Sequence, residues 1–150
     1  LDRIRPGNLI RLLQRYPQAR FVLMHTGYPY NDEMLAIAKH YQNVYVDMCW
    51  SWSIDPLASI DFLRRMLHAV PVNKLFVFGG DTFWPNAAVS FAIQARKWLS
   101  RALHSEINDG LLTEREALWF ASRLMLANQA ECFAIEAKQA AIRALVQTNP

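Results

Sequence analysis

Three short apolar runs, each stopped by polar or turn-forming residues, constrain the fold of this chain most strongly. They are Arg20–His25 (RFVLMH), Asn43–Met48 (NVYVDM) and Lys74–Phe78 (KLFVF). A continuous apolar run, as opposed to an alternating one, is typical of a strand buried on both faces. About 10–15 residues with helical periodicity join each run to the next, which is the βαβ pattern of a parallel sheet. The sequence therefore predicts an α/β fold.

The segments around the strands carry helix start signals. Pro6 suits the first turn of a helix predicted over 6–16, and Asn31 or Asp32 is expected to cap the next helix. After a predicted loop over 49–54, Asp55 is expected to cap a third helix whose first position is Pro56.

From Asn86 onward the sequence predicts helices alone. One helix should run to about His104, before the turn residues at 108–110. Thr113 and Glu116 match a capping box that opens a helix over 114–127, and a last helix is expected over 129–146.

Composition excludes several classes of protein. With 150 residues, 53% of them hydrophobic and 19% charged, the chain fits one folded domain. The net charge is +3 and the basic residues are scattered, so a nucleic-acid partner is not expected. No apolar run approaches the ~20 residues that span a bilayer, so a membrane partner is not expected either.

The two cysteines and the first residue indicate the protein's context. Cys49 and Cys132 lie among apolar residues, as reduced buried thiols do, which favours a cytoplasmic location. The chain begins at Leu1 with neither an initiator methionine nor a signal-peptide pattern. We therefore expect further sequence to precede it in the natural protein.

Polar residues at the ends of the predicted strands are the candidate functional residues. Ligands of parallel α/β folds bind at the carboxyl ends of the strands, a rule that selects His25, Asp47 and Asp81. Taken singly, His25 fits a structural hydrogen-bonding role and Asp81 a turn or cap role. Together, an imidazole and a carboxylate facing one pocket are what a metal-activated water needs.

Other histidines and aromatic residues have simpler interpretations. His40, His68 and His104 fall near helix ends, where they are expected on the surface or as caps. Five aromatic residues follow strand ends and either line a substrate pocket or pack loops: Tyr28, Tyr30, Trp50, Trp52 and Trp84. Two tryptophans on predicted helices are expected in the core: Trp98 and Trp119.

Three segments taken in order resemble one family. They are 21–30 (FVLMHTGYPY), 43–47 (NVYVD) and 74–81 (KLFVFGGD), and together they resemble the amidohydrolase superfamily. The similarity is to metal-dependent hydrolases of the amidohydrolase 2 type, including the hydrolase-like domain fused to some glutamine-synthetase-type proteins. It covers roughly residues 6–135. It implies the C-terminal portion of a TIM-like (β/α)8 barrel, strands six to eight, followed by C-terminal helices. Residues 1–150 would then form a single partial domain.

The resemblance also implies roles for the site residues. His25 would contact the metal-bound water or the substrate, or in some members the metal itself. Asp81 would be both a metal ligand and the proton acceptor, so the catalytic residues would be His25 and Asp81. The cofactor would be a divalent metal, with zinc expected. Asp47 matches no catalytic position and is expected to be structural.

The remaining metal ligands of the family are absent from these 150 residues. These are the His-x-His pair of the first strand, the ligand of the fourth and the histidine of the fifth. Since a catalytic zinc needs about three protein ligands, the chain alone is expected to be inactive.

The implied activity is metal-dependent hydrolysis of a C–N or ester bond in a small-molecule substrate. A decarboxylase or isomerase on the same fold remains an alternative, as does a non-catalytic barrel scaffold. The open edges of a partial barrel also make a homo-oligomer an expected state.

Overall fold

The computed structural model describes residues 2–148 and forms a mostly helical α/β fold around a small parallel sheet. The strands are β1 (Phe21–Met24), β2 (Val44–Asp47) and β3 (Leu75–Phe76). The α-helices are α1 (Ile10–Arg15), α2 (Asn31–His40), α3 (Ser51–Ile54), α4 (Pro56–Ala69), α5 (Pro85–Asn108), α6 (Glu114–Ser122), α7 (Asn128–Cys132) and α8 (Ile135–Thr148). Short 3-10 turns are η1 (Asp2–Ile4), η2 (Pro6–Leu9), η3 (His25–Gly27) and η4 (Val72–Lys74), and η5 (Arg123–Ala127) is π-helical.

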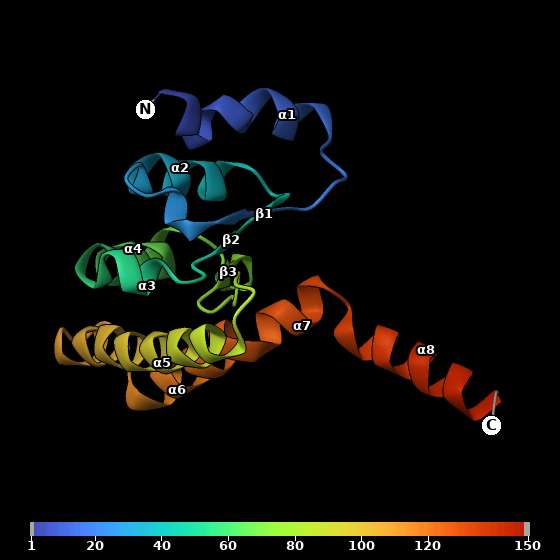
Figure 1. Cartoon of the computed structure of the whole chain (residues 1–150). Helices are drawn as coiled ribbons and strands as arrows, with labels where there is room; N and C mark the ends of the chain where they lie inside the picture. Colours follow the sequence, from blue (N-terminus) through green and yellow to red (C-terminus); the bar gives the residue numbers. More distant parts are fainter. Residues whose placement is uncertain (1, 149–150) are drawn as a thin grey trace.

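The sheet confirms the predicted parallel βαβ order. Its strands lie in the order β1-β2-β3, and both pairs are parallel. Met24 lies opposite Asp47, and Asp47 lies opposite Phe76, so the three strands end in line. The layers follow the chain from α1 through α2 and α4 to α5 and α6 (Figure 1). This alignment brings the three loops that follow the strands to one edge of the sheet.

β3 is shorter than the predicted strand over 74–78, and hydrogen bonds of Val77 explain why. The N–H of Val77 donates to the carbonyl of Leu124 in η5 at 3.2 Å. The carbonyl of Val77 accepts the indole N–H of Trp52 at 2.8 Å. Because both backbone groups of Val77 bind partners outside the sheet, the strand pairing ends at Phe76.

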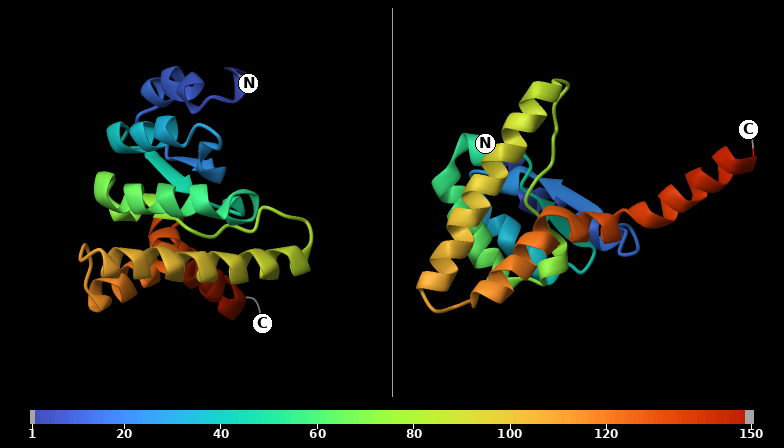
Figure 2. Two further views of the ribbon diagram at one scale, coloured as in Figure 1. Left: turned by 90° about the vertical axis from the view of Figure 1, so that its left-hand side faces the viewer. Right: turned by 90° about the horizontal axis from the view of Figure 1, so that it is seen from below.

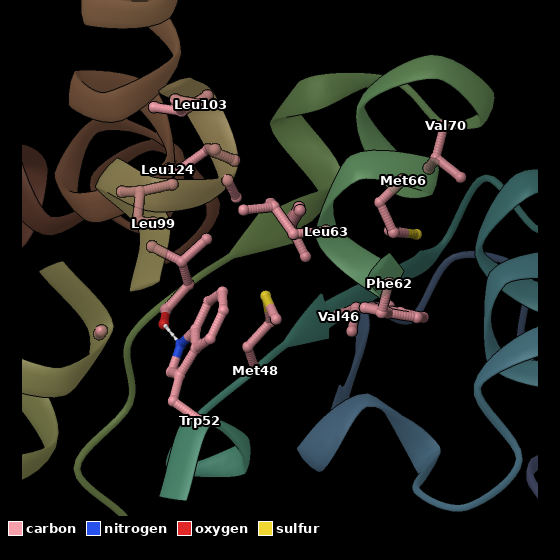
Figure 3. Packing of buried hydrophobic residues seen from close by; sticks show 14 of the residues in the cluster. Val46, Met48, Trp52, Phe62, Leu63, Met66, Val70, Leu99, Leu103 and Leu124 are labelled. Atoms are coloured by element: carbon pink, nitrogen blue, oxygen red, sulfur yellow. Dashed lines mark hydrogen bonds between the residues drawn. The ribbon is translucent and has the colours of Figure 1, made fainter. Parts of the chain in front are cut away.

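The main core lies between the sheet and α4, α5 and α6. Val46 and Met48 point from the second strand region into it, against Phe62 and Leu63 of α4 (Figure 3). Val44 and Val46 are fully buried whereas Tyr45 and Asp47 are only partly so, as expected when successive side chains alternate between the faces of a sheet. The opposite face carries Tyr45 and Phe76, whose rings stack with centroids 6.0 Å apart.

Several helix boundaries differ from the prediction. The helix expected over 6–16 divides into η2 and α1. Neither Asn31 nor Asp32 is the cap of α2, because the helix already includes both and Tyr30 occupies the cap position. The Asn31 amide donates instead to the hydroxyl of buried Thr26, at 3.1 Å.

Two predicted caps are confirmed. The carboxylate of Asp55 accepts the N–H of Ala58 at 3.0 Å, with Pro56 in the first turn of α4. Thr113 and Glu116 form the reciprocal capping box of α6. The loop expected over 49–54 contains the single-turn helix α3.

The C-terminal helices do not break where expected. The prediction of a break between 127 and 129 is wrong, because η5 runs directly into α7. The break falls at Ala134, whose φ of 51° is left-handed, and α8 then projects away from the body (Figures 1 and 2). Between residues 2 and 148, no helix is both long enough and apolar enough to cross a membrane.

Candidate functional site

His25 and Asp81 meet at the carboxyl edge of the sheet. Nε2 of His25 lies 2.9 Å from Oδ2 of Asp81, although the two residues are 56 positions apart in the sequence. His25 directly follows β1, whereas Asp81 lies five residues beyond the end of β3, in a loop through Gly79 and Gly80. Their side chains are 34% and 42% exposed, so both remain accessible to solvent.

Trp50 completes this contact from the loop after β2. Its indole Nε1 donates to the same Asp81 Oδ2 at 3.0 Å, and its ring centroid lies 4.5 Å from that of His25. Each of the three strands therefore contributes one side chain to a single polar cluster. We call His25, Trp50 and Asp81 the strand-end cluster.

The backbone around this cluster is left-handed at several residues other than glycine. The φ angles are 62° at His25, 56° at Thr26, 49° at Cys49 and 35° at Asp81. Such conformations cost roughly 1–3 kcal/mol each and gather at functional sites, where the surrounding structure holds them in place. All three strand-end loops therefore carry backbone strain beside the same cluster.

Asp47 ends β2 and contacts the loops that follow β2 and β3. Its Oδ1 accepts the backbone N–H of Cys49 at 2.8 Å, which turns the loop after β2. A Cβ at Gly79 would come within 2.6 Å of Asp47 Oδ2 and within 2.9 Å of Cys49 Sγ. Only glycine therefore lets the loop after β3 pass over Asp47 and Cys49.

The surroundings shift the ionisation of these groups in opposite directions. The indole N–H of Trp50, and then the imidazole of His25, hold the pKa of the Asp81 carboxyl below its ordinary value. Burial raises the pKa of Asp47 in spite of its hydrogen bond from the Cys49 backbone. Burial, followed by the neighbouring Asp47, strongly raises the pKa of the Cys49 thiol. The environment thus favours the ionised form of Asp81 and the neutral form of the Cys49 thiol.

The donor types of the strand-end cluster suit a divalent metal, but they make up only part of a metal centre. One imidazole and one carboxylate are common zinc ligands, of which a catalytic site needs about three. Nowhere in residues 2–148 do three or more His, Cys, Asp or Glu side chains gather in a way that could hold an ion. His25 and Asp81 would therefore supply at most two of the protein ligands of such a site.

The other aromatic residues expected after strand ends do not join the cluster. Trp52 is buried in the core and donates to Val77, and Tyr30 lies under the guanidinium of Arg5, 5.4 Å from it. Trp84 and Tyr28 are 74% and 44% exposed.

The tryptophans on the later helices have different environments. Trp98 packs against the core, as expected. The prediction that Trp119 is a core residue is wrong, because it is 52% exposed on α6.

The three remaining histidines lie away from the cluster. His40 ends α2 and contacts the carbonyl of Ala36, and His104 is exposed on α5. His68, near the end of α4, lies 2.6 Å from a carboxylate oxygen of Glu106, which is buried in α5. This pairing of His68 was not visible in the sequence, because its partner is 38 residues away.

Sequence reasoning left the roles of Trp50, Cys49 and Gly79 open. Trp50 was only one of five aromatic residues after strand ends, and nothing in the pattern separated it from Trp52. The left-handed conformation of Cys49 has no sequence signal, since a cysteine rarely adopts it. Gly79 did carry one, because glycine in a strand-end loop often marks close approach of the backbone to another group.

Comparison with known proteins identifies the family of this chain. A family model described as amidohydrolase matches residues 1–123. Protein fluG of Emericella nidulans is 30% identical over 127 residues, which are 82% of this chain and 14% of that protein.

A solved structure has a similar fold. It is that of a protein from Lactobacillus casei, provisionally named a metal-dependent hydrolase, with a TM-score of 0.70 and 17% identity. The similarity covers 89% of this chain and 35% of that one. This chain thus spans well under half the length of either protein, and it belongs to the amidohydrolase family.

Proposed function

We propose that this chain supplies part of the active site of a metal-dependent hydrolase that acts on a C–N or ester bond of a small molecule. The contact between His25 and Asp81 carries the proposal, because it joins two strand-end loops at the edge where parallel α/β folds bind ligands. Membership of the amidohydrolase family supports the same reaction class.

Asp81 and His25 would perform distinct tasks in this reaction. With its pKa below the ordinary value, Asp81 is ionised at neutral pH and can bind a cation or accept a proton from water. His25, with its ring next to Asp81, can orient or polarise the oxygen of the water or of the substrate. A divalent metal, zinc by the chemistry of these donors, would supply the activation of water when bound.

The remaining ligands would come from sequence outside this chain. We infer that residues 1–150 form the last three β/α units of a (β/α)8 barrel, whose earlier strands carry the other ligands. The parallel β/α order supports this inference. The coverage of the related proteins also supports it, because the chain matches only 14% of one and 35% of the other. In such a barrel, about 250 residues form one domain.

The experiment uses the longer protein that carries this chain and compares two variants by turnover and by metal content. Asp81→Asn keeps the shape of the side chain but removes its charge. We expect turnover to fall about 10²–10⁴-fold, as when a general base is lost. Metal content should fall as well.

His25→Ala separates the two roles. We expect lower turnover with metal content near that of the wild type, since His25 would work on the oxygen and not as a ligand. Complete metal loss in this variant would instead make His25 a ligand. Asp61→Asn, an exposed carboxylate on α4, is the matched control and should change neither property. Wild-type turnover in Asp81→Asn would refute the proposed function.

A further inference from the structure

Building on the proposed function, we propose that Trp50 is a positioning residue that holds the Asp81 carboxylate and the His25 imidazole in their working orientation. The proposal concerns the indole N–H as well as the ring. A tryptophan that only packed against its neighbours would not need this N–H to donate to Asp81.

The hydrogen bonds at Asp81 are the first line of support. Trp50 Nε1 and His25 Nε2 both lie within 3.0 Å of the same oxygen, Oδ2. Two donors that converge on one oxygen limit rotation of the carboxylate about its terminal torsion, which is otherwise broad. Among residues 2–148, no hydrogen bond is made to the other oxygen, Oδ1, which therefore remains for a cation or a water.

The environment of the indole ring is the second line of support. Its ring contacts those of His25 and Phe91, with centroid distances of 4.5 Å and 6.3 Å. Phe91 belongs to α5, and the same helix holds the loop through a 3.0 Å hydrogen bond from Ser53 Oγ to Gln94 Oε1. The ring is thus held from the side of α5 while its N–H points to Asp81.

The conformation of the loop explains how Trp50 reaches the cluster. Asp47 accepts the N–H of Cys49, and the left-handed Cys49 reverses the chain just before Trp50. Two residues later, Trp52 is buried in the core and donates to the carbonyl of Val77. One tryptophan therefore anchors this loop to the core, and the other presents its N–H to the functional edge.

A purely structural role would make different demands on residue 50. A packing residue needs only the ring, which Trp50→Phe keeps against His25 and Phe91. A positioning residue needs the indole N–H, which that substitution removes. Trp119→Phe makes the same chemical change at an exposed site on α6 and is the matched control.

The first experiment records the indole 1H–15N resonances of the 150-residue protein. Trp50→Phe identifies the Trp50 resonance, and Asp81→Asn should move it upfield, because a neutral amide is a weaker acceptor than a carboxylate. The Trp119 resonance should not move in Asp81→Asn. A Trp50 resonance that is unaffected by Asp81→Asn would overturn the proposal, and this result does not depend on whether the protein is a hydrolase.

The second experiment measures Zn²⁺ affinity by competition with a chelator in the longer protein. Trp50→Phe should weaken Zn²⁺ binding about 10–100-fold, as does loss of other groups that orient a metal ligand. Combined with Asp81→Asn, it should have no further effect, since its partner is gone. Trp119→Phe should bind Zn²⁺ like the wild type.

Two outcomes of this second experiment have distinct meanings. Equal losses from Trp50→Phe with and without Asp81→Asn would show a general structural role and overturn the positioning proposal. Unchanged Zn²⁺ binding in Asp81→Asn itself would refute the proposed function, while the resonance shift would still establish the contact between Trp50 and Asp81.

Discussion

Polar side chains form different contacts at the two ends of the parallel strands, which we call the amino edge and the carboxyl edge of the sheet. At the amino edge, side-chain donors bind backbone carbonyls. Lys74 Nζ donates to Ala38 and Tyr41 at 2.5 Å and 2.6 Å. Asn128 Nδ2 donates to Val72 and Leu75 at 2.7 Å and 2.8 Å, and both donor residues are buried.

At the carboxyl ends of the strands, the side chains of the strand-end cluster bind one another and remain at least partly exposed. His25, Trp50 and Asp81 are linked side chain to side chain, on loops whose backbone is left-handed at His25, Cys49 and Asp81. Buried donors that satisfy carbonyls stabilise a fold, because an unsatisfied buried acceptor is costly. Accessible side chains on strained loops contribute little to stability and are available for chemistry. Under the proposed function, the amino ends of the strands thus serve stability and their carboxyl ends serve chemistry.

The largest effect on stability is expected at the amino edge. Lys74→Met keeps the aliphatic length but leaves the carbonyls of Ala38 and Tyr41 without their charged donor near the end of α2. We expect a loss of about 2–4 kcal/mol in the free energy of unfolding, measured with urea. Lys39→Met, an exposed lysine in the last turn of the same helix, is the control and should have little effect. Equal losses from both would break the contrast between the edges.

The next largest effect concerns Gly79, a closely packed position in the loop after β3. Gly79→Ala would force a Cβ against Asp47 and Cys49, and overpacking of this kind costs about 1–3 kcal/mol. Gly80→Ala is the matched control, since the nearest atom to its Cβ would be 3.8 Å away. Thermal unfolding of both variants tests this. If Gly80→Ala were the more destabilised, the close approach at Gly79 would not be the cause.

A smaller effect of opposite sign is expected from Asp47→Asn. Burial raises the pKa of Asp47 in the folded protein, so its ionised form is less favourable there than in the unfolded chain. The wild type therefore loses stability as the pH rises from the ordinary pKa of 3.8 through the raised value. The asparagine has no such loss and can still accept the N–H of Cys49.

Urea unfolding at several pH values tests this prediction. The free energy of unfolding of Asp47→Asn, relative to that of the wild type, should increase as the pH rises through this window. The increase should persist at neutral pH. A gain that appears only on acidification would mean that the carboxylate stabilises the fold.

The smallest effect on stability is expected from Asp81→Asn in the 150-residue protein. Its carboxylate is exposed, and the contacts that lower its pKa come from side chains that are themselves partly exposed. We expect the unfolding midpoint to shift less than in Gly79→Ala, even though turnover would depend on this residue under the proposed function. A midpoint shift as large as that of Lys74→Met would mean that both edges stabilise the fold.

Local sequence signals determined much of this molecule. The apolar runs placed three parallel strands, since strands buried on both faces need continuous apolar residues. Asp55 and Thr113 correctly predicted where α4 and α6 begin, because capping depends on neighbours within one turn. The strand-end rule selected His25 and Asp81 as site candidates, because parallel strands bring their carboxyl ends together.

Tertiary structure alone decided how those candidates meet. Val77 does not pair with β2, because its N–H donates to the carbonyl of Leu124, far along the chain. The loop that carries Asp81 therefore begins directly after Phe76. Trp50 contacts Asp81 whereas Trp52 is buried in the core. These two orientations depend on the hydrogen bond of Asp47 and on the left-handed backbone at Cys49. Capping and strand formation depend on a few adjacent residues. The direction of a side chain in a loop depends on partners brought near by folding, which the order of residues does not reveal.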